Sequence, residues 1–201
     1  MSKGTDTRSA ILDDAANIAS INGLNGLTIG TLAAHTGMSK SGLFRHFGSK
    51  EELQVATLRA GVDRFTETVV RPALKAPRGV ARVRALFEHW LEWGTNQGFA
   101  GGCIFIPASF ELDDQPGAAR DYLVTTQRDW LDLLATTARR AVEVGDFRPD
   151  LDAAQFAHEF NTILLGFNQA HRLMRDPNAA NRALYQFERL IKDAAHAPQP
   201  A

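Results

Sequence analysis

The residues best suited to specific chemistry lie between Thr28 and Lys50, where basic side chains gather and acidic ones are missing. This stretch contains no Asp or Glu, and its ionisable side chains are His35, Lys40, Arg45, His46 and Lys50. Cations without neighbouring carboxylates can bind anions, and a local cluster of Lys and Arg is the usual electrostatic footprint of nucleic-acid contact. The whole chain has a formal net charge of −1, so such a surface would be local.

The same stretch predicts two short helices, over residues 29–36 and 40–47. Thr28 and Ser39 can cap their amino ends, and a glycine follows each helix. Two short helices joined by a three- or four-residue turn that contains Gly are typical of the helix-turn-helix motif. In that motif the second helix enters the major groove and the first crosses the DNA backbone. The side chains predicted to form its small core are Ile29, Leu32, Ala33, Met38, Leu43 and Phe47.

The run from Gly37 to Leu53 resembles the recognition helix and the start of the next helix in the TetR family of bacterial transcription regulators. It reads GMSKSGLFRHFGSKEEL, and Gly26-Leu27-Thr28 before it matches the family's entry into the motif. The resemblance covers roughly residues 8–60. It implies a homodimer that binds double-stranded operator DNA, acts by default as a repressor and is released by a small apolar or amphipathic effector.

The resemblance also implies roles for single residues. Thr28 would contact phosphate at the amino end of the second helix, where free N–H groups and the helix dipole favour an anion. Arg45 would bond a guanine in bidentate fashion, and Lys40 would contact either a base or a phosphate. His46 and Lys50 would bind phosphates.

Two positions in the recognition helix depart from the family's usual residues. Phe44 stands where Tyr is common, so it can contact a thymine methyl group or a sugar but cannot donate a hydrogen bond. Gly42 replaces a commoner Thr or Ala and removes one apolar base contact. The predicted DNA-binding set is Thr28, Lys40, Ser41, Gly42, Phe44, Arg45, His46 and Lys50.

Helical spacing of apolar residues continues along the chain, and the fold class predicted is all-α with about nine helices. Further helices are expected over residues 7–22, 49–70, 80–97, 118–144, 153–175 and 177–195. Residues 103–111 are not assigned, because their apolar run with Pro107 also allows a strand. The expected domains are a helix-turn-helix domain (5–50), a linker helix and joint (51–78) and a ligand-binding and dimerisation domain (79–196).

Aromatic residues with a few isolated polar groups characterise the larger domain, and small-molecule pockets commonly have this composition. The residues predicted to line a pocket are Trp90, Trp93, Cys103, Phe105, Phe110, Trp130, Phe160 and Asn161. Helix-turn-helix proteins commonly bind DNA as two-fold dimers, and the last two helices offer apolar ridges for a dimer interface. The residues predicted to pair two copies are Phe167, Ala170, Leu184, Phe187 and Ile191; the alternative interpretation places such residues in the core of their own chain.

Several other classes of protein lack support in the sequence. No apolar run approaches the length needed to cross a bilayer, and the amino end does not resemble a signal peptide, so a cytoplasmic protein without membrane association is expected. A single cysteine, Cys103, excludes an intramolecular disulfide and a cysteine-only zinc site. No HExxH, nucleophile-elbow, Walker A or dinucleotide motif occurs, so no metal, cofactor or enzymatic activity is predicted. The alternative is a helical small-molecule-binding protein or enzyme whose N-terminal helices are only structural.

Overall fold

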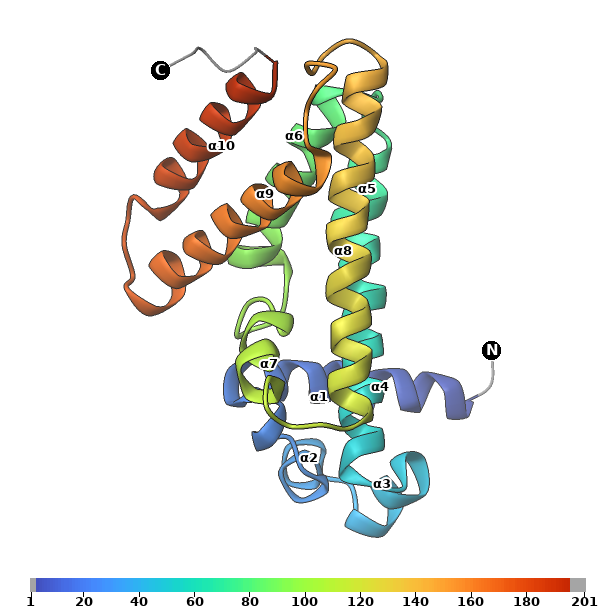
Figure 1. The fold of residues 1–201 in the computed structure, drawn as a ribbon. Coiled ribbons are helices and arrows are strands. Elements are labelled where there is room, and N and C mark those ends of the chain that lie inside the picture. The colour runs from blue at the N-terminus through green and yellow to red at the C-terminus, as the bar shows by residue number, and fades with distance from the viewer. Residues whose placement is uncertain (1–2, 196–201) are drawn as a thin grey trace. The chain divides into compact units, whose positions relative to one another are not determined.

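The computed structural model describes residues 3–195, and these residues are mostly helical (Figure 1). The α-helices are α1 (Lys3–Gly26), α2 (Ile29–Thr36), α3 (Lys40–Phe47), α4 (Lys50–Phe65), α5 (Arg71–Leu74), α6 (Val80–Glu92), α7 (Phe105–Leu112), α8 (Ala118–Glu143), α9 (Ala153–Asn168) and α10 (Ala179–Ala195). Three π-helical segments extend helices: η1 (Thr66–Val70), η2 (Trp93–Gln97) and η3 (Gln169–Leu173). Over 3–195 the only β-pairing is an isolated bridge between Phe99 and Gly102, so the all-α prediction is confirmed.

The chain divides into two compact units, which are described separately. The first consists of the chain up to Thr66 together with Thr95–Thr126, and the second of Glu67–Gly94 together with the chain from Gln127 onward. Residues 95–126 therefore pack with the N-terminal helices, although sequence analysis expected one larger domain from residue 79. Residue 196, the expected end of that domain, lies outside the described residues.

In the first unit, α1 to α4 surround a core of leucines that are at most 1% exposed, namely Leu24, Leu27, Leu32, Leu43, Leu53 and Leu58. Helix α1 packs against α2, α4 and α7. Its backbone bends at Gly23, whose φ of 75° interrupts the helix near the end expected at Asn22. The bend redirects the chain toward α2.

Helices α2 and α3 begin and end at the residues that their caps predicted. Thr28 and Thr31 form a reciprocal capping box, in which Thr28 Oγ1 accepts from Thr31 N at 3.0 Å and Thr31 Oγ1 from Thr28 N at 2.9 Å. Ser39 Oγ accepts from Gly42 N at 3.1 Å at the start of α3. Ser49 does the same for Glu52 N at the start of α4. These local bonds satisfy N–H groups that lack a partner in the helix.

The unassigned stretch 103–111 is a helix, not a strand. In and before α7, Ile104, Phe105, Ala108 and Leu112 are buried, and this spacing places them on one helical face. That face packs within the first unit, where α7 contacts α1. Tertiary packing therefore decides between the two conformations that the local sequence allowed.

In the second unit, three phenylalanines from three helices form the centre of the core. Phe87 of α6 lies parallel to Phe187 of α10, with ring centroids 3.9 Å apart. Phe160 of α9 meets both rings edge-on, at 5.7 Å and 5.5 Å. All three side chains are less than 2% exposed, so α6, α9 and α10 are fixed to one another by aromatic packing.

Candidate nucleic-acid interface

Helix α3 buries one face and exposes the other. Leu43 and Phe47 are 0% and 2% exposed and fix the helix on the core of the first unit. The opposite face carries Lys40, Ser41, Phe44 and Arg45, which are all exposed, and Gly42 and His46 are half-buried beside them. The side chains predicted to read DNA therefore project from a helix that is anchored from behind.

The predicted small core of the helix-turn-helix is present. Ile29, Leu32 and Ala33 of α2 are buried with Leu43 and Phe47 of α3, and Met38 in the turn is half-buried. No acidic residue occurs between Thr28 and Lys50. The exposed surface of α2 and α3 is therefore free of carboxylates of its own.

Lys40 lies close to the amino end of α2. A Cβ built on Gly30, the second residue of α2, would be 3.9 Å from Lys40 Cε and 3.6 Å from Thr28 Oγ1. The first N–H groups of a helix and the positive end of its dipole attract anions. The ammonium group of Lys40 thus adds a full positive charge beside a partial one.

Lys50 is engaged inside the chain. Its Nζ donates a hydrogen bond to the carbonyl oxygen of Asn25 at 3.1 Å, which ties the start of α4 to the end of α1. An ammonium group has three donors, so this bond leaves two for another acceptor. Lys50 combines a structural contact with its predicted phosphate contact.

Two residues near this surface were not identified from the sequence. Arg8 of α1 is exposed, and its guanidinium carbon lies 5.3 Å from the centroid of the Phe47 ring. Gln54 of α4 is buried, and its Nε2 donates to the carbonyl oxygen of Leu24 at 2.9 Å. Both contacts join residues more than 25 positions apart, so no local sequence pattern could have revealed them.

The residues predicted to line a pocket are divided between the two units. Trp90, Trp93 and Phe160 are buried in the second unit, where Trp130 Nε1 also donates to Asn161 Oδ1 at 3.1 Å. Cys103, Phe105 and Phe110 belong to the first unit.

Two of these residues in the first unit are buried and the third is not. Cys103 and Phe105 are 5% and 6% exposed. Phe110 is 75% exposed on α7 and is the one predicted lining residue that faces solvent.

The residues predicted to pair two copies lie mainly inside their own chain. Phe167, Phe187 and Ile191 are 3%, 1% and 7% exposed, which matches the alternative interpretation that they fill the subunit core. Ala170 is half-buried, and Leu184 is 46% exposed. For Phe187 the correction has a clear reason, because its ring is stacked on Phe87 and has no surface left for a partner.

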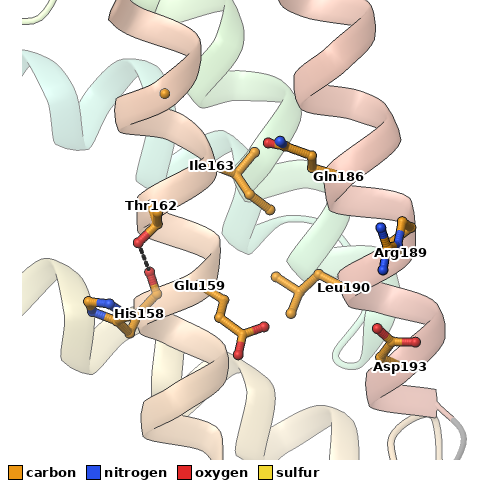
Figure 2. Close-up of a pocket in the computed structure, with 9 residues that line it drawn as sticks. His158, Glu159, Thr162, Ile163, Gln186, Arg189, Leu190 and Asp193 are labelled. Carbon is orange, nitrogen blue, oxygen red and sulfur yellow. Dashed lines mark hydrogen bonds between the residues drawn. The ribbon is translucent and has the colours of Figure 1, made fainter.

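A groove of about 580 Å³ runs along the exposed side of the α9–α10 pair (Figure 2). Polar and charged side chains line it from both helices, with Ile163 and Leu190 between them (Figure 2). The lining residues are His158, Glu159, Thr162, Ile163, Gly166, Gln186, Arg189, Leu190 and Asp193. A Cβ built on Gly166 would meet no atom within 4 Å.

Within residues 3–195, no group of three or more His, Cys, Asp or Glu side chains could hold a metal ion. None of the helices described is both long and apolar enough to span a bilayer.

Comparison with known proteins assigns both parts of the chain. A family model described as "Bacterial regulatory proteins, tetR family" matches residues 11–57. A second, described as "Tetracyclin repressor-like, C-terminal domain", matches residues 79–187, more than half of the chain. The chain belongs to the TetR family of transcriptional regulators.

Two TetR-family repressors are similar in sequence. The transcriptional repressor AcnR of Corynebacterium efficiens is 37% identical over 67 residues, and the match covers 33% of this chain and 36% of AcnR. The chain thus matches about a third of the length of AcnR. The repressor KstR2 of Mycobacterium tuberculosis is 28% identical over 151 residues, which cover 72% of this chain and 71% of KstR2.

Solved structures of TetR-family proteins have the same fold. A TetR regulator from Chloroflexus aurantiacus superposes with a TM-score of 0.80 at 23% identity, covering 96% of both chains. AibR, solved in complex with isovaleryl coenzyme A and operator DNA, superposes with a TM-score of 0.67 at 28% identity, covering 81% of this chain and 86% of AibR.

The TetR-family match and the compact units divide the chain at different places. Residues 95–126 fall within the matched C-terminal domain, yet they pack in the first unit with α1 to α4. The helices of the matched N-terminal domain in this family member therefore share a core with part of the C-terminal region.

Proposed function

We propose that this TetR-family protein is a non-enzymatic repressor that binds operator DNA through α3. The observation that carries the proposal is the arrangement of α3, where buried Leu43 and Phe47 present Lys40, Ser41, Phe44 and Arg45 to solvent on a helix that contains no acidic residue. A helix so anchored can enter the major groove without rearrangement of its own side chains. Its length of 8 residues is sufficient, because only its exposed face meets base edges.

We assign different tasks to the two cations of α3. Lys40 contacts phosphate, because its side chain ends beside the amino end of α2 and the cap residue Thr28. Arg45 lies on the exposed face and contributes base recognition, since its guanidinium fork matches the O6 and N7 atoms of guanine. His46 and Lys50 add phosphate contacts on either side.

We infer that the protein works as a homodimer and that the second copy occupies the α9–α10 groove. The groove presents Glu159 on one helix and Arg189 on the other, so two copies related by a two-fold axis offer complementary charges to each other. Gly166 and Thr162 keep the α9 side of the groove low, which permits close approach of helices. Exposed Leu184 stays a candidate contact at the edge, whereas Phe187 does not.

The proposed effector is a small apolar or amphipathic molecule that lowers operator affinity by favouring a non-binding state. The aromatic lining predicted from Trp90, Trp93, Trp130 and Phe160 supports an apolar ligand, and the Trp130–Asn161 hydrogen bond supplies a polar group beside it. AibR, a structural relative, was solved with isovaleryl coenzyme A. Short-chain acyl-coenzyme A thioesters are therefore the first class to test.

The DNA-binding proposal is tested by selecting duplexes from a random pool at low salt and measuring affinity by fluorescence anisotropy. The wild-type chain should enrich a duplex sequence with two-fold symmetry. Arg45→Ala should no longer prefer that sequence, while its circular dichroism and unfolding temperature remain those of the wild type. A log–log plot of affinity against salt should slope downward, since phosphate contacts release counterions. Failure of the wild type to retain any duplex at low salt contradicts the proposal.

The dimer proposal has a separate test in Gly166→Trp. A Cβ at Gly166 meets no atom within 4 Å, so the indole can extend into the groove, the monomer should fold and the dimer should not form. Light scattering should give the mass of a monomer, and operator affinity should fall because the dimer is lost. The matched control is Ala180→Trp, because Ala180 is exposed on α10 but does not line the groove. A dimeric Gly166→Trp protein places the interface elsewhere.

A further inference from the structure

The last turn of α1, which leads into α2, is held by side chains from two other helices. The N–H group of Asn25 donates to Glu111 Oε2 of α7 at 2.7 Å, and the carbonyl oxygen of the same residue accepts from Lys50 Nζ at 3.1 Å. Gln54 holds the preceding carbonyl, that of Leu24. Three residues after Asn25 comes Thr28, the cap residue of α2. The amino end of α2 is thus set by contacts from outside the helix-turn-helix.

Gly23 creates the space that Glu111 occupies. A Cβ at this position would lie 1.8 Å from Glu111 Oε1, and the φ of 75° is itself unfavourable for other residues. The carboxylate therefore rests against the bend of α1, where only glycine fits. The contact between α7 and the turn is a specific fit, and it joins residues 86 positions apart.

A second carboxylate joins the start of α4 to the start of α8. Glu51, in the first turn of α4, accepts a hydrogen bond from the N–H group of Ala118 at 2.8 Å. Ala118 is the first residue of α8, so this N–H group has no partner within its helix. The positive end of the helix dipole there favours an anion, and the Glu51 carboxylate supplies it. Gly117 has a φ of 154°, which favours glycine, and a Cβ there would lie 2.6 Å from Glu51 Oε1.

The two contacts converge on the segment Glu111–Ala118, which we call the α7–α8 corner. Through Glu111 the corner holds the approach to α2, and through Ala118 it holds the start of α4. Helix α3 lies between α2 and α4 in the chain, so the segment that leads into one neighbour and the first turn of the other are both bonded to the corner. The corner itself belongs to the region matched as the C-terminal domain.

We propose that Glu111 and Glu51 are positioning residues for operator binding, and that the α7–α8 corner sets operator affinity by holding α2 and α4 in the DNA-binding arrangement. The inference rests on the proposed function. Neither carboxylate contacts DNA itself; each positions the backbone that presents Thr28, Lys40 and Arg45. Because Ala118 is the first residue of α8, a displacement of the start of α8 would reach the Glu51 contact directly.

The first test compares Glu111→Ala with Glu111→Gln in the full-length protein, on the duplex selected by the wild type. Glu111→Ala should weaken operator binding about tenfold, because a charge-assisted hydrogen bond to a backbone N–H is lost. Glu111→Gln should stay within about threefold, since its Oε1 can still accept the bond. The slope of log affinity against log salt should not change for either variant, because no phosphate contact is removed.

Asp114→Ala is the matched control for charge. Asp114 is an exposed acid on the same corner, and its removal alters the net charge as Glu111→Ala does. It should leave operator affinity unchanged or slightly raised. Hydrogen exchange supplies the structural readout, since the Asn25 amide should lose protection in Glu111→Ala and keep it in Glu111→Gln and Asp114→Ala.

A double-mutant cycle between Gly23→Ala and Glu111→Ala tests the fit directly. Gly23→Ala should reduce operator affinity more in the wild-type background than in Glu111→Ala, because the clash disappears and only the backbone strain remains. Additive effects would overturn the inference, as would wild-type affinity in Glu111→Ala or an equal loss in Glu111→Gln. A wild-type chain that binds no duplex would reject the proposed function itself, and the positioning role with it.

Discussion

The guanidinium group of Arg84 in α6 forms a bidentate ion pair with the carboxylate of Glu188 in α10. Nη2 donates to Oε2 at 2.8 Å, and Nη1 donates to Oε1. The hydrogen bond to Arg84 is the main cause that lowers the pKa of Glu188, and the same bond raises the pKa of Arg84. The guanidinium carbon also lies 6.0 Å from the ring centroid of Phe187, so the pair covers the stacked aromatic core.

This pair should make the stability of the protein depend on pH at the acidic end. Because the pKa of Glu188 is lower in the folded chain, the stabilisation is complete above the ordinary carboxylate pKa and is lost as pH falls through the folded value. Glu188→Gln should therefore reduce the free energy of unfolding in neutral buffer, and the difference should vanish in acid. Both side chains are more than a third exposed, so the effect should stay below about 1 kcal/mol. Urea unfolding across pH measures it; a difference that grows in acid contradicts it.

Removal of Lys40 and removal of Arg45 should change DNA affinity in different ways. Lys40→Ala should weaken binding to operator and unrelated duplexes alike, and lower the salt slope by about one phosphate contact. Arg45→Ala should remove about 1–3 kcal/mol of preference for the operator, because a bidentate base contact is lost. Anisotropy titrations on both duplexes at several salt concentrations separate the two patterns. Equal loss of sequence preference in both variants would show that Lys40 also contacts a base.

Substitutions at Phe187 and Leu184 should distinguish an effect on the stability of the subunit from an effect on dimer assembly. Phe187→Ala removes a buried ring that stacks on Phe87, and should lower the free energy of unfolding by about 3–5 kcal/mol. Leu184→Ser changes a side chain that is 46% exposed, so it should leave the unfolding of the subunit nearly unchanged. Chemical unfolding and light scattering on both variants give the two readouts. A Phe187→Ala protein that retains its stability but becomes monomeric would return Phe187 to the interface.

Sequence reasoning succeeded where structure depends on neighbouring residues. The helices over 29–36 and 40–47 were predicted at their observed bounds, because Thr28, Ser39 and the glycines after each helix act within one turn. The exposed and buried faces of α3 also follow from local spacing. The longer helices were less accurate at their ends, where residues expected to stay α-helical form π-helical segments, as in η1 after Phe65.

Prediction failed where distant contacts decide the outcome. Residues 105–112 form a helix because α1 packs against them, and nothing local distinguishes that from a strand. Phe187 was placed at an interface, since periodicity shows that a residue is buried but not which surface buries it. Glu51 and Glu111 were missed for the same reason, because each acts on backbone far away in sequence.

Phe44 offers a test in which binding should improve. Its side chain is 52% exposed on the side of α3 that we propose faces DNA, at the position where the resembled pattern commonly carries Tyr. Phe44→Tyr adds a hydroxyl group at the solvent end of the ring, so the packing of Leu43 and Phe47 should be undisturbed and the unfolding temperature unchanged. The hydroxyl can donate a hydrogen bond to a phosphate oxygen, which is worth about 0.5–1.5 kcal/mol. Operator affinity should therefore rise severalfold.

The same gain should appear on unrelated duplexes, because a phosphate contact carries no sequence information. Phe44→Leu is the control, since it keeps an apolar side chain without the ring and should lose only contacts to sugars and thymine methyl groups. A rise in affinity confined to the operator would assign the hydroxyl to a base edge instead. No rise on either duplex would mean that the ring of Phe44 does not face the backbone, and that α3 lies in the groove at a different rotation from the one proposed.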